Sequence, residues 1–187
     1  MAIEEPKFSI IESSEQFELR AYEPKIVAET FVSGSAYDAS RTGFKRIANY
    51  IFGNNTSASG SNEKISMTAP VTIEQQSENV AMTAPVTLEE QDDMWRVHFV
   101  MPAGYTMETL PTPNSKSVTL REIPASNYAV ISFSGLSGEK KVARKTNELL
   151  SWLESKNITP TGKPELARYN TPWTPPFMRR NEVMVSY

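Results

Sequence analysis

Cysteine is absent from the 187 residues of this chain, and His98 is its only histidine. The lack of cysteine excludes disulfide bonds, thiolate nucleophiles, iron–sulfur clusters and thiolate-held zinc. His98 is therefore the only imidazole available to bind iron or to act as a general base. In the alternating segment 95–101 it shares a strand face with Arg96 and Val100. This pattern favours a histidine at the surface of a sheet.

Long apolar runs are also missing, because no window approaches the ~20 apolar residues that a membrane-spanning helix needs. Residues 1–7 lack the basic start and the apolar run of a secretion signal. These absences predict a soluble, cytoplasmic protein without a membrane span.

Neither sign of charge dominates, since 19 basic and 22 acidic side chains give a formal charge of −3. Nucleic-acid-binding domains carry a strongly basic footprint, so nucleic acid is not an expected partner. Four basic residues gather in one helical segment, and we interpret them as a solvated helix face. They are Lys140, Lys141, Arg144 and Lys145.

The residues that are present fit one globular domain over 1–187, with 39% apolar content for a single core. From Phe17 to Gly34 the sequence alternates as strands do, and a turn follows at 33–35. A helical pattern comes next and should end near Gly53, which tolerates the left-handed backbone of a helix end. Its apolar positions recur three or four residues apart, at Phe44, Ile47, Ala48 and Ile51.

A weaker copy of this pattern appears 101 residues later, where Leu120-Arg121 echoes Leu19-Arg20 and Ser134-Gly135 echoes Ser33-Gly34. A second helix follows and should end near Asn157. Two strand-like segments come after each helix: 65–73 and 95–101 in the first half, 166–173 and 182–187 in the second. The sequence therefore predicts an α+β fold of two strand-helix-strand-strand halves around a shared sheet.

One hexapeptide, MTAPVT, occurs twice, at 67–72 and again at 82–87. A turn at 77–78 would pair the two copies as an antiparallel hairpin, with apolar residues opposite each other throughout. The predicted pairs are Met67 with Leu88, Ala69 with Val86, Val71 with Ala84 and Ile73 with Met82. In the alternative arrangement one copy is paired and the other lies in a loop.

Several short pieces of the chain resemble the SOUL heme-binding protein family, in the correct order and over nearly the whole length. The pieces are 18–24 (ELRAYEP), 42–44 (TGF), 49–51 (NYI), 64–71 (KISMTAPV), 100–102 (VMP) and 179–183 (RRNEV). The resemblance implies a distorted, barrel-like antiparallel sheet of two pseudo-symmetric halves flanked by two helices. This fold is similar to that of the effector-binding domains of transcription regulators.

The resemblance also implies that the chain binds heme or another porphyrin. Some members carry a histidine, considered an iron ligand, where this chain has Ala21, so no metal ligand is assigned. Other members lay the macrocycle on the first helix, with basic side chains toward the propionates. The matching positions here are Arg41, Phe44 and Ala48; Asn49 and a residue near Pro175 replace two other basic side chains. Lys45, one turn from Arg41, can substitute for one of them, and Phe52 extends the apolar face.

The proline-rich segment 172–177 allows two interpretations: a ligand for a proline-recognition domain, or an ordered loop whose aromatics close over the sheet. We favour the ordered loop. By the family resemblance it lies near the rim of the pocket, which adds Trp173, Phe177 and Met178 as candidate ligand contacts. Glu182 begins the last strand after two arginines, where a structural ion pair is expected.

Three functions are consistent with these residues. The first is a non-catalytic carrier or buffer of heme or a related tetrapyrrole, with heme as ligand and not as catalytic cofactor. The second is a small-molecule effector-binding or interaction domain. The third is a tetrapyrrole-modifying enzyme, which would have to use carboxylates such as Glu182 or the bound iron itself.

Overall fold

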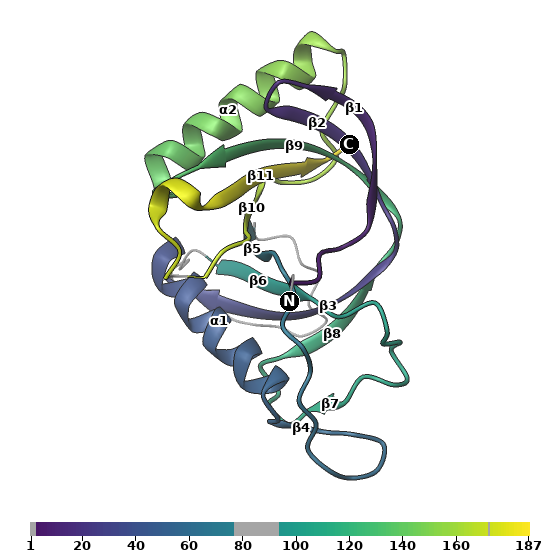
Figure 1. Cartoon of the computed structure of the whole chain (residues 1–187). Coiled ribbons are helices and arrows are strands. Elements are labelled where there is room, and N and C mark those ends of the chain that lie inside the picture. The colour runs from purple at the N-terminus through teal and green to yellow at the C-terminus, as the bar shows by residue number, and fades with distance from the viewer. Residues whose placement is uncertain (1–2, 77–93, 172) are drawn as a thin grey trace, which may run out of the picture.

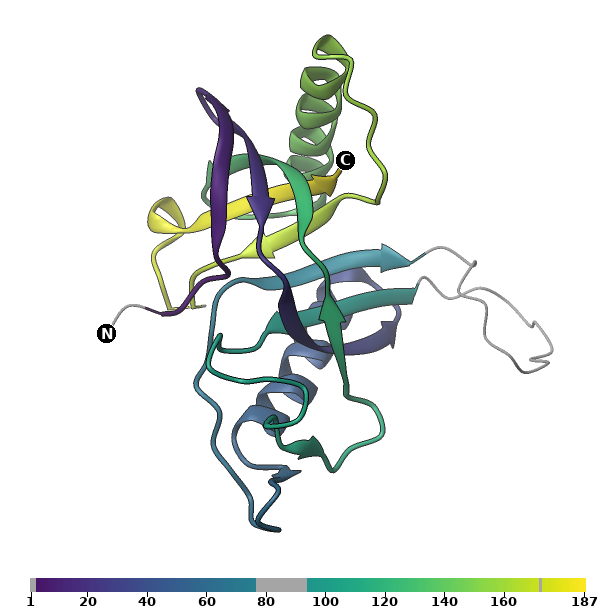
Figure 2. The same ribbon diagram turned by 90° about the vertical axis from the view of Figure 1, so that its right-hand side faces the viewer.

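The computed structural model describes residues 3–76, 94–171 and 173–187. One sheet of nine antiparallel strands curls on itself, and both helices pack on the same face of it (Figures 1 and 2). The strands are β1 Phe8–Ser14, β2 Phe17–Tyr22, β3 Lys25–Ser33, β5 Val71–Gln76, β6 Met94–Val100, β8 Thr119–Ile123, β9 Ser126–Ser134, β10 Glu165–Arg168 and β11 Arg180–Ser186. The helices are α1 Ala36–Ile51, α2 Glu139–Ser155 and the 3₁₀ turn η1 Pro176–Met178; β4 Asn55–Thr56 and β7 Thr112–Pro113 form a separate pair.

The strand order has a pseudo-two-fold arrangement about the β10–β5 junction. The full order is β1-β2-β9-β11-β10-β5-β6-β3-β8. Five strands lie on the β10 side of the junction and four on the β5 side. Each side takes in a strand from the other half of the chain, since β2 pairs with β9 and β8 pairs with β3. The predicted α+β fold of two pseudo-symmetric halves is confirmed, and the halves exchange a strand.

Helix α1 begins and ends where local chemistry predicts. The Ser35 hydroxyl caps the N-terminus by accepting a hydrogen bond from the Asp38 backbone N–H. The helix ends at Ile51 with Phe52 as its C-cap, and Gly53 follows with φ of +118°, a left-handed conformation that favours glycine. Its buried residues include Ile47 and Ile51, which pack with strands β3, β5 and β6.

Gly43 brings α1 unusually close to the sheet, because a Cβ at this position would lie 2.6 Å from the Cβ of Val97. We expect Gly43→Ala to destabilise the fold by about 1–3 kcal/mol, the usual cost of overpacking a core. Chemical denaturation measures this difference. Gly104→Ala is the matched control, since nothing lies within 4 Å of its added Cβ. Equal stability of the two variants would contradict the close approach.

Helix α2 follows β9 as α1 follows β3, which confirms the second helix predicted from the internal repeat. Leu149 and Leu153 of α2 are buried in the same core cluster as Ile47 and Ile51 of α1. Trp152 stacks on Phe17 of β2, with 4.9 Å between the ring centroids. Among the described residues, no helix is long and apolar enough to cross a bilayer.

The predicted hairpin between the two MTAPVT copies is wrong at the residues where it can be tested. Val71 lies between Phe99 of β6 and Arg168 of β10, and Ile73 has neighbours on the same two strands. Pairing of these residues with Ala84 and Met82 is therefore excluded, because both ladder positions are filled. The second copy itself lies outside the described residues. The strand expected over 65–73 begins only at Val71, directly after a proline, which cannot donate to a ladder.

Candidate functional site

The five residues predicted on the first helix lie along one side of α1. Arg41, Phe44, Ala48 and the C-cap residue Phe52 follow one another at three- or four-residue spacing, and Lys45 lies one turn after Arg41. Phe52 is 57% exposed and Phe44 is 36% exposed, with the Phe44 ring 5.4 Å from the ring of Phe99 in the sheet. Ala48 is only 8% exposed. The apolar surface on this side therefore comes from the two phenylalanines.

Two cations border this apolar surface. Arg41 and Lys45 are exposed, and within the described residues neither makes a hydrogen bond or an ion pair. Arg46, by contrast, donates to the backbone carbonyl of Phe31 at 3.0 Å. The arrangement leaves two positive charges able to pair with an anionic ligand without breaking an existing contact.

The predicted loop residues lie on the connection between β10 and β11. The loop is ordered by its own turns, with Met178 N–H donating to the Pro175 carbonyl and the Arg179 guanidinium to the Thr174 carbonyl. Its aromatics do not close over the sheet as expected, because Trp173 is 90% exposed and Phe177 is 77% exposed. The expectation failed because the internal turns of this short loop direct these side chains outward.

The loop and α1 meet at the same edge of the molecule (Figure 1). Arg168, at the end of β10, donates from one terminal nitrogen to the Ser40 hydroxyl of α1 at 2.8 Å. Its Nε donates to the Ser137 hydroxyl before α2 at 3.1 Å. Residues far apart in sequence are thus held together here, beside the start of α1.

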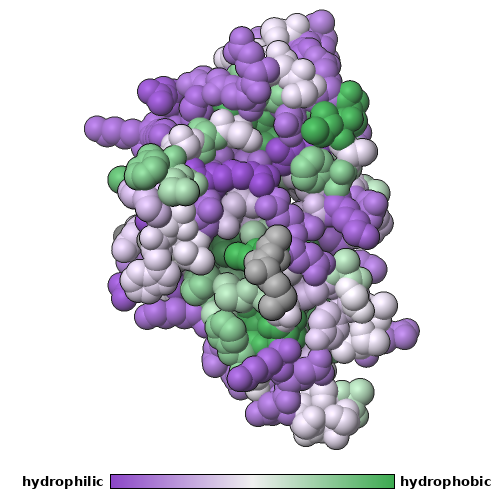
Figure 3. Space-filling model, viewed as in Figure 1, coloured by the Kyte–Doolittle hydropathy of each residue, from purple (hydrophilic) through white to green (hydrophobic). Residues whose placement is uncertain are grey.

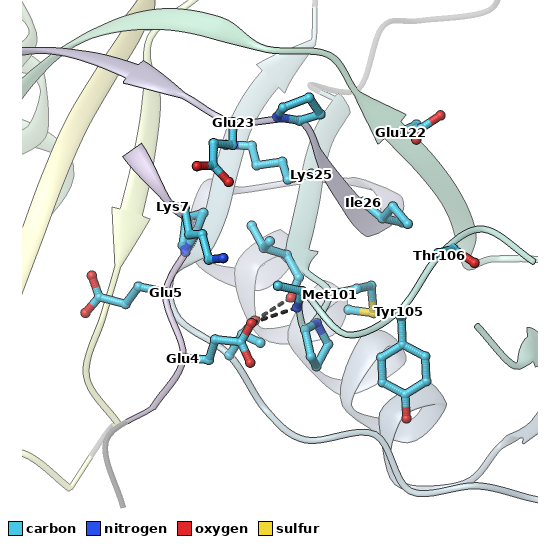
Figure 4. Close-up of a pocket in the computed structure, with 16 residues that line it drawn as sticks. Glu4, Glu5, Lys7, Glu23, Lys25, Ile26, Met101, Tyr105, Thr106 and Glu122 are labelled. Atoms are coloured by element: carbon cyan, nitrogen blue, oxygen red, sulfur yellow. Dashed lines mark hydrogen bonds between the residues drawn. The ribbon is translucent and has the colours of Figure 1, made fainter. Parts of the chain in front are cut away.

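A cavity of about 300 Å³ lies elsewhere, between the N-terminal segment and the ends of β3 and β6. Figure 4 shows it framed by Glu4, Glu5 and Lys7 on one side and by Ile26, Met101 and Tyr105 on the other. None of the eight predicted site residues lines it. Its volume is at the lower limit for small-molecule pockets, which suits a ligand smaller than a porphyrin.

The sheet face turned away from the helices carries charged side chains. Glu29, His98, Thr72, Ala167 and Glu182 lie directly opposite one another across successive strands. In the neighbouring row, Arg96 forms ion pairs with Glu74 and with Glu29, the latter at 3.6 Å. Within the described ranges these groups form no cluster suited to a metal ion.

His98 is part of this face and is only 3% exposed, so the prediction of a surface histidine is wrong. It does share its face with Arg96 as expected, but the curled sheet buries that face. Burial and the nearby Arg96 charge lower the pKa of His98 well below its ordinary value, and the imidazole is neutral. Because His98 lies on the face opposite α1, it cannot ligate an iron bound on the outer side of that helix.

Glu182 forms the structural ion pair that its sequence context predicts, because the preceding Arg180 donates two hydrogen bonds to its carboxylate, at 3.0 and 3.1 Å. Arg20 donates two further hydrogen bonds to the Glu182 carboxylate, at 2.9 and 3.0 Å, and the Tyr169 hydroxyl donates another at 2.6 Å. Burial alone would raise the pKa of Glu182, but the hydrogen bonds and charge of Arg20 lower it below the ordinary value. The carboxylate is fully buried and occupied, and so has no free oxygen for catalysis.

Sequence reasoning assigned no role to Arg20 or Glu165. Arg20 offered one signal, a basic residue within an alternating strand, but its partner is 162 residues away. Glu165 lies 3.8 Å from Arg96 and 3.9 Å from His98. Burial and the adjacent Glu74 raise the pKa of Glu165 to about 7. No local pattern marks this glutamate, because the strands that surround it are distant in sequence.

A family model described as SOUL heme-binding protein matches residues 3–186. No curated protein matches the chain. Among solved structures, the EcmrR C-terminal domain has a TM-score of 0.62 and 14% identity, with 91% of this chain and 96% of that one covered. A structure titled as a hydrolase from Listeria innocua has a TM-score of 0.57 and 11% identity, covering 94% and 93%. At these identities the likeness shows the fold alone.

Proposed function

Because the chain belongs to the SOUL heme-binding protein family, we propose that it binds heme or a related tetrapyrrole without converting it, as a carrier or buffer. The observation that supports this most directly is the side of α1 on which exposed Phe44 and Phe52 are bordered by two unpaired cations, Arg41 and Lys45. A porphyrin has the complementary chemistry, since it is a flat apolar ring with two carboxylates at one edge.

In this proposal the ring lies against Phe44, Ala48 and Phe52, and the propionates meet Arg41 and Lys45. Burial of a few hundred Å² of apolar surface at about 25 cal/mol per Å² yields several kcal/mol before the cost of association. Charge-assisted contacts to each propionate add to this. Such contacts suffice for a dissociation constant on the order of micromolar without any bond to iron.

The loop side chains Trp173, Phe177 and Met178 form the second wall of the proposed site. Their exposure leaves them free to pack on a ligand seated on the neighbouring helix. Met178 carries the one thioether of the set, an atom type that ligates heme iron in some proteins, but the proposal assigns no axial ligand. A cytoplasmic location stays a prediction.

Titration of the protein with hemin tests this proposal, and Arg41→Glu is the informative variant. We expect the wild type to shift the Soret band and to lose tryptophan fluorescence at micromolar hemin. Replacing Arg41 by glutamate removes a charge-assisted contact and adds repulsion, which should weaken binding by about tenfold or more.

Lys163→Glu is the matched control, because Lys163 is exposed near the C-terminal end of β11, away from α1, and its charge reversal should leave the titration unchanged. An absent spectral change at stoichiometric hemin, or equal affinity of the Arg41 and Lys163 variants, would refute the proposal.

The cavity beside Tyr105 supports a second candidate, a small-molecule effector-binding domain. Four carboxylates line the cavity against two lysines, an acidic balance that attracts cations; they are Glu4, Glu5, Glu23 and Glu122 against Lys7 and Lys25. Stabilisation of the fold by a broad set of amphipathic cations, with no response to hemin, would favour this candidate. Conversion of heme to an open-chain bilin under reducing conditions would instead indicate an enzyme.

A further inference from the structure

The most exposed apolar side chains gather at one edge of the molecule. Among the described residues, every large apolar side chain that is more than 60% exposed lies there. We call this set the aromatic edge; it consists of Tyr37 (70%), Leu136 (61%), Trp173 (90%), Phe177 (77%) and Met178 (63%). Figure 3 shows apolar side chains at the left-hand edge of the molecule, set among hydrophilic ones. Exposure of this degree is costly unless another surface covers it.

Hydrogen bonds hold the segments of the aromatic edge together. Arg168 joins Ser40 of α1 to Ser137, which lies between β9 and α2. Asn181 donates from its amide to the Gly135 carbonyl at 2.9 Å. Met178 lines a shallow depression together with Ser132, Phe133, Ser134, Arg179 and Arg180. The start of α1, the start of α2 and the β10–β11 loop therefore lie at the same edge of the molecule (Figure 1).

Positive charge surrounds the aromatic edge, although the whole chain has a formal charge of −3. Exposed Lys140 and Arg144 lie in the first two turns of α2, and exposed Arg41 lies one turn from Tyr37. The acidic residues in the same turns are Asp38 and Glu139. Arg179 adds a further cation within the loop. The edge combines projecting aromatic side chains with a basic border.

We propose that the aromatic edge docks onto an anionic membrane surface, with Trp173, Phe177 and Leu136 in the headgroup region and Lys140 and Arg144 on the lipid phosphates. Tryptophan and tyrosine favour this interface, because their rings are apolar and carry one polar group. Basic residues beside such a patch are attracted by the negative surface potential of anionic lipids. The side chains project from short loops and helix starts, which suits a flat, deformable lipid surface better than the groove of a protein.

The docking surface and its border share Trp173, Phe177, Met178 and Arg41 with the proposed tetrapyrrole site, but Leu136, Lys140 and Arg144 belong to the docking surface alone. Variants at these three positions therefore separate the two proposals. Leu136 is exposed, as are Lys140 and Arg144, so their replacement leaves the core intact.

Co-sedimentation of the ligand-free full chain with vesicles tests the docking. One set of vesicles contains phosphatidylglycerol in phosphatidylcholine, and the other contains phosphatidylcholine alone. We expect binding to the anionic vesicles only, weakened by high salt. The double variant Lys140→Glu/Arg144→Glu should lower the partition coefficient by about tenfold or more, and Leu136→Asp should lower it several-fold.

The double variant Lys116→Glu/Lys163→Glu makes the same change in charge at exposed positions outside the edge and should bind like the wild type. Brominated lipid should quench the fluorescence of the wild type but not that of Trp173→Phe. Equal binding to both vesicle types, no binding at all, or full binding by Lys140→Glu/Arg144→Glu would overturn the docking proposal. If Lys140→Glu/Arg144→Glu loses vesicle binding but binds hemin like the wild type, the loss is independent of the tetrapyrrole site.

Discussion

Replacing Arg20 with methionine is expected to lower the free energy of unfolding by about 3–5 kcal/mol, the usual cost of breaking a buried ion pair from one side. Glu182 is fully buried, and Arg20 supplies two of its hydrogen bonds. The variant removes the buried partner of this carboxylate and leaves the more exposed Arg180 as its remaining cation. The melting temperature should fall by roughly 6–20 °C for a chain of this size.

Two further variants distinguish the effect of breaking the ion pair from the effect of removing an arginine side chain elsewhere. Arg144→Met removes a cation that is 66% exposed and 3.6 Å from Glu148, and should change stability by less than about 1 kcal/mol. The double variant Arg20→Met/Glu182→Met should be more stable than Arg20→Met alone, because it also removes the buried carboxylate that has lost the Arg20 charge. Denaturant unfolding of the three variants measures these differences. An Arg20→Met variant that loses less than about 1 kcal/mol would contradict this role of Arg20.

Replacing Glu165 with glutamine is expected to stabilise the fold at pH 8 by about 3 kcal/mol. Burial and the neighbouring Glu74 raise the pKa of Glu165 to about 7, from an ordinary value of 4.5. Between these two values the folded chain holds a proton that the unfolded chain has released. Wild-type stability from this group therefore falls as the pH rises through that window. Glutamine removes the ionisation and with it this loss.

The contribution of His98 to the pH dependence of stability has the opposite sign, because its pKa is lowered in the folded state. Below about pH 6.5 His98 is protonated in the unfolded chain but stays neutral in the folded chain. The free energy of unfolding therefore falls as the pH drops. In the wild type the two effects oppose each other at mildly acidic pH. In Glu165→Gln only the His98 effect remains, and the advantage of this variant over the wild type should shrink toward pH 5.5.

Denaturant unfolding at pH 8 and pH 5.5 tests both statements. Glu122→Gln is the matched control, since this glutamate is exposed on β8 and its replacement should leave the pH dependence unchanged. A Glu165→Gln variant that is less stable than the wild type at pH 8 would show that attraction to Arg96 and Lys25 outweighs the cost of burial.

Local patterns predicted the elements of the fold better than their pairing. The period of apolar residues gave α1, and the helix ended beside Gly53 as its chemistry predicts. The identical MTAPVT copies suggested a hairpin, but sequence identity carries no information about hydrogen-bonded neighbours. Val71 instead pairs with strands that begin 23 and 94 residues further along the chain. The edge strand β1 was not predicted at all.

In the candidate site, too, local geometry could be predicted from the sequence, whereas burial and long-range contacts could not. Helical spacing correctly placed Arg41, Phe44 and Lys45 on one side of α1, because that depends on local geometry alone. Alternation likewise placed His98 and Arg96 on one strand face. It could not reveal that the face is buried, because burial depends on how the whole sheet curls. The Arg20–Glu182 pair was inaccessible for the same reason, as it joins two strands separated by β9.

The position of a bound porphyrin distinguishes the α1 site from the cavity beside Tyr105. Gallium protoporphyrin is diamagnetic, so amide chemical shifts of the labelled chain can be followed as it binds. We expect the largest changes on α1 around Arg41, Phe44 and Lys45, and on the loop at Trp173. Changes centred on Ile26 and Tyr105, beside the cavity of Figure 4, with α1 unaffected, would contradict the proposed α1 site.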